Sequence, residues 1–280
     1  MVNNEVITSS QNQYVSLARS LDSRKNREKQ RLFRIDGVKL MCEAVKKRAN
    51  IKFALFAESV CQTVLEKAHR LYGVVENELD FRKFIISDRL FEQLSDEKSP
   101  EGVICVAEYL ENKHREVSSE GLSADSDSKI LLLESLRDPQ NVGAVIRVAA
   151  AFGVDKIIMS RDCADIYSPK TLRAAMGTVF DVRIDRVDDL PLAVEKLRGY
   201  GRRVFAAALD RDSVKLGELE MKSGDCVVIG NEGHGLTNET VSACNGTVFI
   251  PMSDGVESLN AATAAAVLVW EFFGLGKDKR

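Results

Sequence analysis

Two apolar runs near the C-terminus, each followed at once by a loop, constrain the fold of this chain more than any other feature. Residues 227–229 (Val-Val-Ile) lead into the run 230–236 (Gly-Asn-Glu-Gly-His-Gly-Leu), and residues 248–250 (Val-Phe-Ile) lead into a loop over 251–257. Short β-branched runs predict buried strands. Three glycines so close together let backbone approach a ligand and leave N–H groups free to bind it. Since α/β proteins hold ligands at the carboxyl ends of their strands, both loops are predicted to form one site.

Three motifs in order give this site a family resemblance. Ile-Gly-Asn-Glu-Gly-x-Gly-Leu begins at Ile229, Ile-Pro-Met begins at Ile250 and is followed by Ser-Leu-Asn at 258–260, and Asn-x-Gly-x-x-x-Arg runs from Asn141 to Arg147. They resemble motifs 2, 3 and 1 of the SpoU/TrmH family. That family consists of S-adenosylmethionine-dependent RNA ribose 2'-O-methyltransferases of the SPOUT superfamily. The resemblance implies an enzyme of that kind.

The first part of the chain predicts a smaller domain of its own. Short apolar strands alternate with amphipathic helices between residues 33 and 107, which is typical of an α/β/α domain. The segment resembles the SpoU substrate-binding domain, which has an L30e-like fold, although Asp36 stands where that family more often has Glu. The matching residues are Phe33, Ile35, Gly37, Val38, Lys39, Pro100, Gly102 and Val103.

Three segments are therefore expected: an L30e-like RNA-binding domain over 1–110, a linker over 111–129, and a methyltransferase domain over 130–280. The linker is inferred from its five serines and few apolar residues. Short, nearly all-apolar strands after residue 130 predict a parallel sheet covered on both faces. A helix is expected over 142–152, with Asn141 as its N-cap. The resemblance implies a deep trefoil knot in the C-terminal domain. The residue pattern by itself would not suggest one, because threaded chains are very rare.

Methyl transfer to a ribose hydroxyl requires a placed methyl donor, an in-line oxygen about 3 Å away, and help with removal of the hydroxyl proton. It requires no metal. Backbone groups near Gly230, Ile250 and Leu259 suit an adenine, although simple core packing would also explain Ile250 and Leu259. The resemblance implies that S-adenosylmethionine is bound by Leu209, Gly230, Asn231, Gly233, Ile250, Met252 and Leu259.

The residues expected to serve catalysis are Asn141, Arg147, Glu232, Ser258 and Asn260. A guanidinium is a poor base, since its pKa exceeds about 12, so Arg147 is expected to stabilise a developing alkoxide or to hold the adjacent phosphate. Glu232 is expected to anchor Arg147 or the loop. The alternatives are a surface salt bridge for Arg147, helix capping for Asn141 and Ser258, and a solvated loop carboxylate for Glu232.

Charge is distributed unevenly along the chain. The net charge is −3, yet residues 19–34 hold seven basic and two acidic side chains. This run is either a patch that follows RNA phosphates or a solvated helix face. The expected partner is ribosomal or transfer RNA. Two other functions stay open, namely a catalytically silent RNA-binding protein on the same fold and a SPOUT enzyme that methylates a base.

The remaining features bear on assembly and location. An apolar, alanine-rich stripe from Leu259 to Phe273 resembles the family's dimer region, so a homodimer through the C-terminal domain is expected. The six cysteines form no Cys-x-x-Cys pair, and no metal site is predicted. The N-terminus has no apolar signal segment, and the longest apolar run is too short to span a bilayer, so a cytoplasmic protein without membrane contact is expected.

Overall fold

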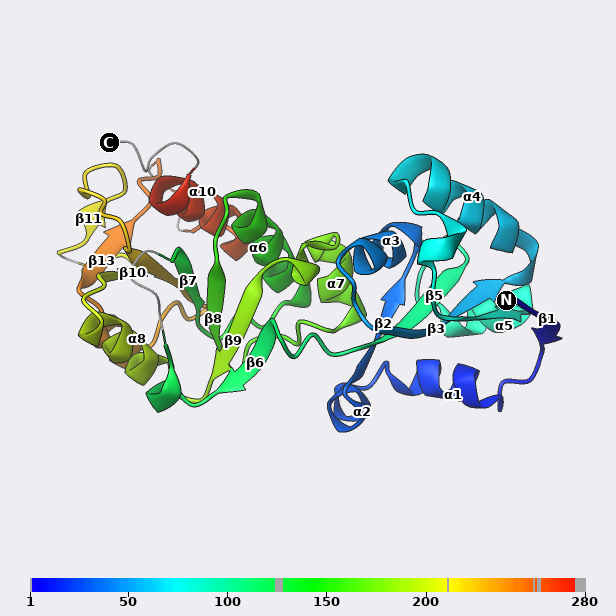
Figure 1. Cartoon of the computed structure of the whole chain (residues 1–280). Helices are drawn as coiled ribbons and strands as arrows, with labels where there is room; N and C mark the ends of the chain where they lie inside the picture. Colours follow the sequence, from blue (N-terminus) through cyan, green and yellow to red (C-terminus); the bar gives the residue numbers. More distant parts are fainter. Residues whose placement is uncertain (1, 124–127, 211, 254, 256–257, 275–280) are drawn as a thin grey trace. The chain divides into compact units, whose positions relative to one another are not determined.

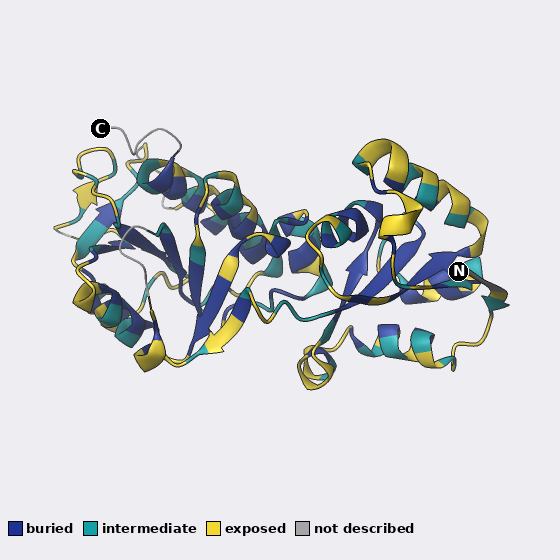
Figure 2. Cartoon of the chain, viewed as in Figure 1, coloured by how far each residue is buried: buried dark blue, intermediate teal, exposed yellow. Residues whose placement is uncertain are grey.

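The structure is a computed structural model that describes residues 2–123, 128–210, 212–253, 255 and 258–274. The chain forms two compact units. Unit 1 contains Met1–Leu110 and Asp165–Phe180, and unit 2 contains Glu111–Ala164 and Asp181–Arg280. Figure 2 shows that buried residues follow the strands of each unit and the inner faces of the helices.

Unit 1 contains a five-stranded mixed sheet among its described residues, in the order β1-β4-β3-β5-β2. Strands β1, β4 and β3 are parallel to one another, whereas β5 is antiparallel to both β3 and β2. The elements are β1 (Val2–Ile7), α1 (Gln13–Ser20), α2 (Arg24–Gln30), β2 (Leu32–Asp36), α3 (Val38–Lys46), β3 (Ile51–Ala57), α4 (Cys61–Tyr72), β4 (Arg82–Ile86), α5 (Asp88–Leu94), β5 (Val103–Glu108) and the short turns η1 (Glu58–Val60) and η2 (Glu76–Glu78).

Helices cover both faces of this sheet, as the residue pattern predicts. Buried side chains of α1 and α5, such as Val15 and Leu90, pack on one face against Phe53, Leu55 and Ile104. Figure 1 shows α3 and α4 on the opposite face. Because side chains alternate along a strand, β3 and β5 bury apolar residues on both faces.

Unit 1 also includes a segment that the sequence does not assign to it. Residues 165–180 hold α7 (Pro169–Ala175) and η4 (Thr178–Phe180). Asp165 accepts hydrogen bonds from the buried Arg27 at 2.6 and 3.0 Å, and the Tyr167 ring stacks on Tyr109 with centroids 3.9 Å apart. Phe33 contacts both Tyr167 and Phe180. These residues form part of the apolar core of unit 1.

Unit 2 contains an eight-stranded sheet among its described residues, and every strand pair in it is parallel. The order is β11-β13-β10-β12-β7-β8-β9-β6. The elements are β6 (His114–Val117), η3 (Ser119–Gly121), β7 (Ile130–Leu133), α6 (Pro139–Ala151), β8 (Lys156–Ser160), β9 (Arg183–Val187), α8 (Leu190–Gly199), β10 (Val204–Ala207), β11 (Val214–Lys215), β12 (Cys226–Ile229), α9 (Asn238–Ala243), β13 (Gly246–Phe249) and α10 (Ala261–Phe273).

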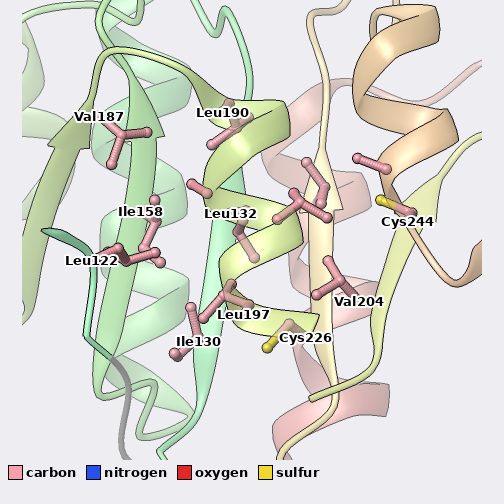
Figure 3. Close-up of a cluster of buried hydrophobic side chains, with 14 of the residues drawn as sticks. Leu122, Ile130, Leu132, Ile158, Val187, Leu190, Leu197, Val204, Cys226 and Cys244 are labelled. Carbon is pink, nitrogen blue, oxygen red and sulfur yellow. The ribbon is translucent and has the colours of Figure 1, made fainter. Parts of the chain in front are cut away.

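The large sheet is apolar on both faces. On one face α8 and α9 pack over alternate strand residues, among them Ile130, Leu132 and Val228 (Figure 3). The intervening residues, such as Leu131 and Leu133, point to the other face, where Figure 1 shows α6 beside α10. This confirms the predicted parallel sheet covered on both faces.

The structure differs from the sequence predictions at three places. The predicted linker 111–129 includes the edge strand β6, which pairs with β9. Helix α6 begins at Pro139, three residues before its predicted start, and Asp138 is its N-cap. Residues 165–180, which fall inside the predicted methyltransferase domain over 130–280, belong to unit 1. The trefoil knot is a matter of chain threading, which strand order does not establish, and it stays a prediction.

The six cysteines are free, and five of them are buried. Burial raises the pKa of the Cys42 and Cys226 thiols to about 11, so both are protonated at neutral pH. Within the described residues, no group of three or more His, Cys, Asp or Glu side chains is placed to hold a metal ion. None of the helices in the described part of the chain has the length and apolar composition that a bilayer crossing requires.

Candidate active site

Strands β10, β12 and β13 are parallel neighbours in the large sheet, and a cavity of about 360 Å³ lies at their carboxyl ends. This size is in the range of about 300–1,000 Å³ that small-molecule sites occupy. The lining comes from the three strand ends, the loops that follow them and the first turns of α10. It consists of Ala207, Ala208, Leu209, Ile229, Gly230, Asn231, Glu232, Gly235, Val248, Phe249, Ile250, Met252, Ser258, Leu259, Ala261, Ala264 and Leu268.

Most of the expected cofactor residues lie at this cavity. Leu209, Gly230, Asn231, Ile250, Met252 and Leu259 all contribute to its wall, and so do Glu232 and Ser258 from the expected catalytic set. Among the described residues Gly233 does not belong to the lining. In the loop over 251–257, Asp254, Val256 and Glu257 lie outside the described residues.

The glycine loop, defined as residues 230–237, folds back on itself. Asn231 and Gly235 form an isolated antiparallel bridge, with N–H to O distances of 3.0 and 2.9 Å. A Cβ on Gly230 would lie 2.4 Å from the backbone carbon of Gly235, and Gly235 has a φ of +68°. Gly233 has no such requirement, since the nearest atom to an added Cβ is 3.5 Å away. The glycines at 230 and 235 therefore serve the loop's own fold.

This geometry changes the role expected for the backbone N–H groups of the loop. The Asn231 and Gly235 N–H groups form the bridge, and the Asn231 Oδ1 accepts from Gly233 N at 2.8 Å and from His234 N at 3.2 Å. The expectation that these donors are free to bind a ligand was wrong. Their hydrogen bonds stay within the loop, and four of its residues, Gly230, Asn231, Glu232 and Gly235, line the cavity.

Three of the five expected catalytic residues form one hydrogen-bonded chain. Asn260 Nδ2 donates to Asn141 Oδ1 at 3.0 Å, and Asn141 Nδ2 donates to Glu232 Oε1 at 2.5 Å. They come from α6, the glycine loop and the N-cap of α10. The chain thus joins all three motifs at one place, and Glu232 extends it to the cavity wall.

The capping alternatives for these residues are also settled by the structure. Asn141 is the third residue of α6 rather than its N-cap, because Asp138 Oδ1 accepts from Gln140 N at 2.8 Å. Asn260, not Ser258, is the N-cap of α10, and its Oδ1 accepts from Ala262 N at 2.9 Å. Asn260 therefore has two functions, since its Nδ2 still donates to Asn141.

Arg147 lies exposed on α6, and it makes no hydrogen bond or ion pair with any described residue. The salt-bridge alternative therefore has no support among these residues. Glu232, which the sequence allowed as a partner of Arg147, bonds Asn141 instead. The contacts in the structure do not join Arg147 to the Asn260–Asn141–Glu232 chain.

Sequence reasoning missed two residues that directly follow β7, Glu134 and Ser135. Glu134 is buried, and its carboxylate accepts hydrogen bonds from Thr237 and Thr240. Ser135 has a φ of +55°, and its carbonyl accepts from Asn231 Nδ2 at 2.8 Å. One signal in the sequence could have identified Glu134. It directly follows the apolar run Ile130–Leu133, and a carboxylate beside a buried strand is expected to have hydrogen-bond partners.

The position of Ser135 is fixed by a small polar cluster. Its N–H donates to Ser160 Oγ at 2.9 Å, and its hydroxyl donates to Asp162 Oδ2 at 2.5 Å. Partial burial opposes ionisation of Asp162, but hydrogen bonds from the Ser135 and Ser160 hydroxyls lower its pKa overall. Asp162 is therefore a firm acceptor for both serines at neutral pH.

In unit 1, the basic run over 19–34 is not one uniform surface. Arg27 and Arg34 are buried, with Arg27 bonded to Asp165 and Arg34 paired with Asp22 at 2.8 Å and Asp36 at 3.0 Å. Lys25 and Lys29 are exposed on α2. Only part of the run can therefore contact a partner.

Comparisons with known proteins agree with this geometry. The sequence pattern of the SpoU rRNA Methylase family matches residues 128–270, which is more than half of the chain. The MRM3-like substrate binding domain matches residues 12–105. The 23S rRNA (guanosine(2553)-2'-O)-methyltransferase RlmP of Bacillus subtilis is 28% identical over 268 residues, which cover 96% of this chain and 99% of that protein.

Solved structures show the same architecture. An rRNA methyltransferase from Sinorhizobium meliloti is 26% identical, with a TM-score of 0.77, and the match covers 96% of each chain. An AdoMet-bound rRNA methyltransferase from the same organism is 25% identical, with a TM-score of 0.76 and coverage of 96% of this chain and 97% of that one. With the three motifs joined by hydrogen bonds at one site and the family pattern matched over residues 128–270, this chain belongs to the SpoU rRNA Methylase family.

Proposed function

We propose that this protein transfers a methyl group from S-adenosylmethionine to a ribose 2'-hydroxyl in RNA. The observation that carries the proposal is the hydrogen-bonded chain Asn260–Asn141–Glu232, which ends at the wall of the 360 Å³ cavity. Membership of the SpoU rRNA Methylase family supports both the reaction and the donor.

The cavity suits S-adenosylmethionine in size and lining. Its apolar lining includes Ile229, Ile250, Leu259 and Leu268, which can cover an adenine, and the glycine loop adds the polar residues Asn231 and Glu232 to the lining. When bound, S-adenosylmethionine supplies a sulfonium methyl group that a ribose oxygen can attack directly. The side chain of Asn231 is bonded to Ser135, Gly233 and His234, so we assign it to the structure of the loop rather than to the methyl donor.

Catalytic roles follow from the positions of the side chains. Arg147 is exposed and uncommitted among the described residues, which suits a guanidinium that stabilises charge on the ribose oxygen or holds the neighbouring phosphate. Glu232 and Asn260 are fixed through Asn141. Ser258 is exposed at the cavity and takes no part in capping α10, which leaves its hydroxyl for substrate.

Ribosomal RNA is the proposed substrate, and unit 1 is proposed to bind it. The match of residues 12–105 to a substrate binding domain and the 23S rRNA specificity of the Bacillus subtilis relative support this assignment. A cytoplasmic location would place the enzyme with that RNA.

A homodimer through unit 2 is also part of the proposal. Thr263, Val267 and Trp270 form an exposed stripe on α10, and the Val267 and Trp270 side chains are 37% and 50% exposed. The residues that α10 buries within the chain lie on its other side, among them Ala265 and Leu268. An exposed apolar stripe on a helix is typical of a subunit interface.

The test is methylation of unmodified 23S rRNA by the full-length protein with labelled S-adenosylmethionine, followed by mapping of the labelled nucleoside. Label in a 2'-O-methylnucleoside is expected. Label in a base would instead identify a base methyltransferase. If S-adenosylmethionine binding cannot be measured although the protein binds RNA, the chain is a silent RNA-binding member of the family.

A further inference from the structure

We propose that Glu134 is a positioning residue that holds the glycine loop in its binding shape before the methyl donor arrives. The inference rests on the proposed function, because it takes S-adenosylmethionine as the ligand of that loop. It concerns a residue outside the cavity wall and outside the three motifs.

Glu134 contacts the chain on both sides of the glycine loop. Its N–H donates to the carbonyl of Ile229, directly before the loop, at 2.9 Å. Its carboxylate accepts from Thr237 N at 2.8 Å and from the Thr237 hydroxyl at 2.9 Å, at the end of the loop. One residue directly after β7 therefore fixes the distance between the two ends of the loop.

The carboxylate also satisfies the first turn of α9. Thr240 is fully buried, and its hydroxyl donates to Glu134 Oε1 at 2.5 Å. Thr237 is the N-cap of α9 and accepts from Thr240 N at 3.2 Å. A charged acceptor that takes three donors makes stronger hydrogen bonds than a neutral one. Without it, the buried Thr240 hydroxyl would lose this partner.

Ser135 supports the same loop from its first residues. Its carbonyl accepts from Asn231 Nδ2, and Asn231 Oδ1 in turn accepts from Gly233 N and His234 N. A serine with positive φ persists only where its surroundings determine the conformation, and Ser160 and Asp162 do so here. The two residues after β7 thus hold the beginning and the end of the glycine loop.

The hydrogen bonds of Glu134 and Ser135 to the glycine loop, here called the clamp, should affect the affinity for S-adenosylmethionine. Residues 232–235 of the loop are exposed, so the loop has few apolar contacts of its own. A loop that is already ordered loses less conformational freedom when a ligand binds. Removal of the clamp should therefore weaken S-adenosylmethionine binding, while turnover at saturating donor should change little.

The experiment compares Glu134→Ala, Glu134→Gln and Asp225→Ala in the full-length protein. Asp225 is a matched control, since it is equally buried at 5% exposure and accepts hydrogen bonds from Arg203 and Lys222, but it precedes β12 rather than following β7. Calorimetry gives the affinity for S-adenosylmethionine. Hydrogen exchange of the 230–237 amides, measured without ligand, reports the order of the loop independently of activity.

Glu134→Ala is expected to weaken S-adenosylmethionine binding by about 10-fold or more and to speed exchange across the glycine loop. Glu134→Gln should lie between it and the parent protein, because one amide oxygen can still accept from Thr237. Asp225→Ala should leave loop exchange unchanged.

Two results would overturn the positioning role. One is parent-like affinity and loop exchange in Glu134→Ala, and the other is an equal loss of affinity in Asp225→Ala, which would indicate general destabilisation. If Glu134→Ala does not fold, Glu134→Gln supplies the same comparison. Failure of the parent protein to bind S-adenosylmethionine would instead refute the proposed function.

Discussion

Arg147 is the residue whose proposed role is tested most directly by mutation. Its guanidinium is exposed on α6, so replacement should not disturb the fold. If it stabilises charge that forms only in the transition state, Arg147→Ala should lower the single-turnover rate by about 10²-fold or more and leave S-adenosylmethionine affinity nearly unchanged. Arg147→Lys should restore little, because a point charge does not reproduce a forked donor.

The control for this variant is Arg183→Ala, which removes another exposed arginine of unit 2, on β9. It should retain the parent rate. A near-normal single-turnover rate for Arg147→Ala at saturating RNA would make Arg147 dispensable and shift the catalytic role to Glu232 or Asn260.

Two glycines of the same loop should respond differently to the same substitution. Gly230→Ala would place a Cβ 2.4 Å from backbone atoms of Gly235, which cannot move away as a flexible side chain could. Gly233→Ala meets nothing closer than 3.5 Å. Calorimetry should show S-adenosylmethionine affinity reduced by about 10-fold or more in Gly230→Ala, and unchanged within about 2-fold in Gly233→Ala. Equal losses would mean that the loop does not need its observed bridge.

Helix α2 combines a structural arginine with exposed lysines, and the two kinds should separate in experiment. Arg27 is buried against Asp165, and removal of one partner from a buried ion pair costs about 3–5 kcal/mol. Arg27→Ala should therefore lower the thermal unfolding temperature. Lys25→Ala with Lys29→Ala should leave stability unchanged, weaken RNA binding and reduce the salt dependence of affinity by about one unit for each phosphate that the lysines neutralise.

Thermal melts and RNA titrations at several salt concentrations measure both effects. The solvated-face interpretation of α2 predicts no change in the salt slope for the lysine variant. A parent-like melting temperature for Arg27→Ala would show that the buried ion pair contributes little to the fold.

At the level of elements, the sequence predicts buried apolar strands better than polar strands at the edge of a sheet. The strand over Ile130–Leu133 is unambiguous, because four apolar residues are bounded by charged and polar ones. Strand β6 has no such pattern: it reads His-Arg-Glu-Val at a sheet edge, where Arg115 pairs with Asp185 of β9. Its strand structure depends on pairing with β9, about 70 residues away in sequence, and the local residue pattern gives no sign of that pairing.

The start of α6 shows a second limit. Asp138 and Asn141 are both good N-caps, and only the fixed φ of Pro139 at the first helical position favours the earlier one. Choosing Asp138 places Asn141 inside the helix, where its amide is free to bridge Glu232 and Asn260. The meeting of the three motifs was expected from the sequence, whereas the path of the hydrogen bonds was not.

Over the whole molecule, residues 165–180 limit how the chain can be divided. Tyr167, Leu172 and Phe180 are buried in unit 1, although the segment lies between β8 and β9 in sequence. A fragment of residues 111–280, which keeps all of unit 2, should expose these side chains and aggregate. The same fragment with 165–180 replaced by a Gly-Ser segment of equal length should stay in solution and bind S-adenosylmethionine.

Size-exclusion chromatography and calorimetry of the two fragments make the comparison. A fragment of 111–280 that is fully soluble and as stable as its Gly-Ser counterpart would show that the segment does not depend on unit 1. The sequence offered no signal for this arrangement, because Ser168 and Pro169 begin a helix that looks like any other crossover helix.

The proposed homodimer makes the last prediction. Thr263, Val267 and Trp270 lie at helical spacing on the exposed side of α10, and the Trp270 ring contacts Phe152 edge-on at 5.5 Å while remaining half exposed. Val267→Lys would place an ammonium group where the partner's apolar surface is expected, and burial of an unpaired charge is strongly unfavourable. Light scattering at micromolar concentration should therefore give twice the chain mass for the parent protein and the single-chain mass for the variant. Glu195→Gln on α8, which changes the net charge by the same single unit at an exposed position, should remain dimeric. If Val267→Lys stays dimeric, the stripe on α10 is not the interface, and if the parent protein is itself a single chain, the dimer proposal fails.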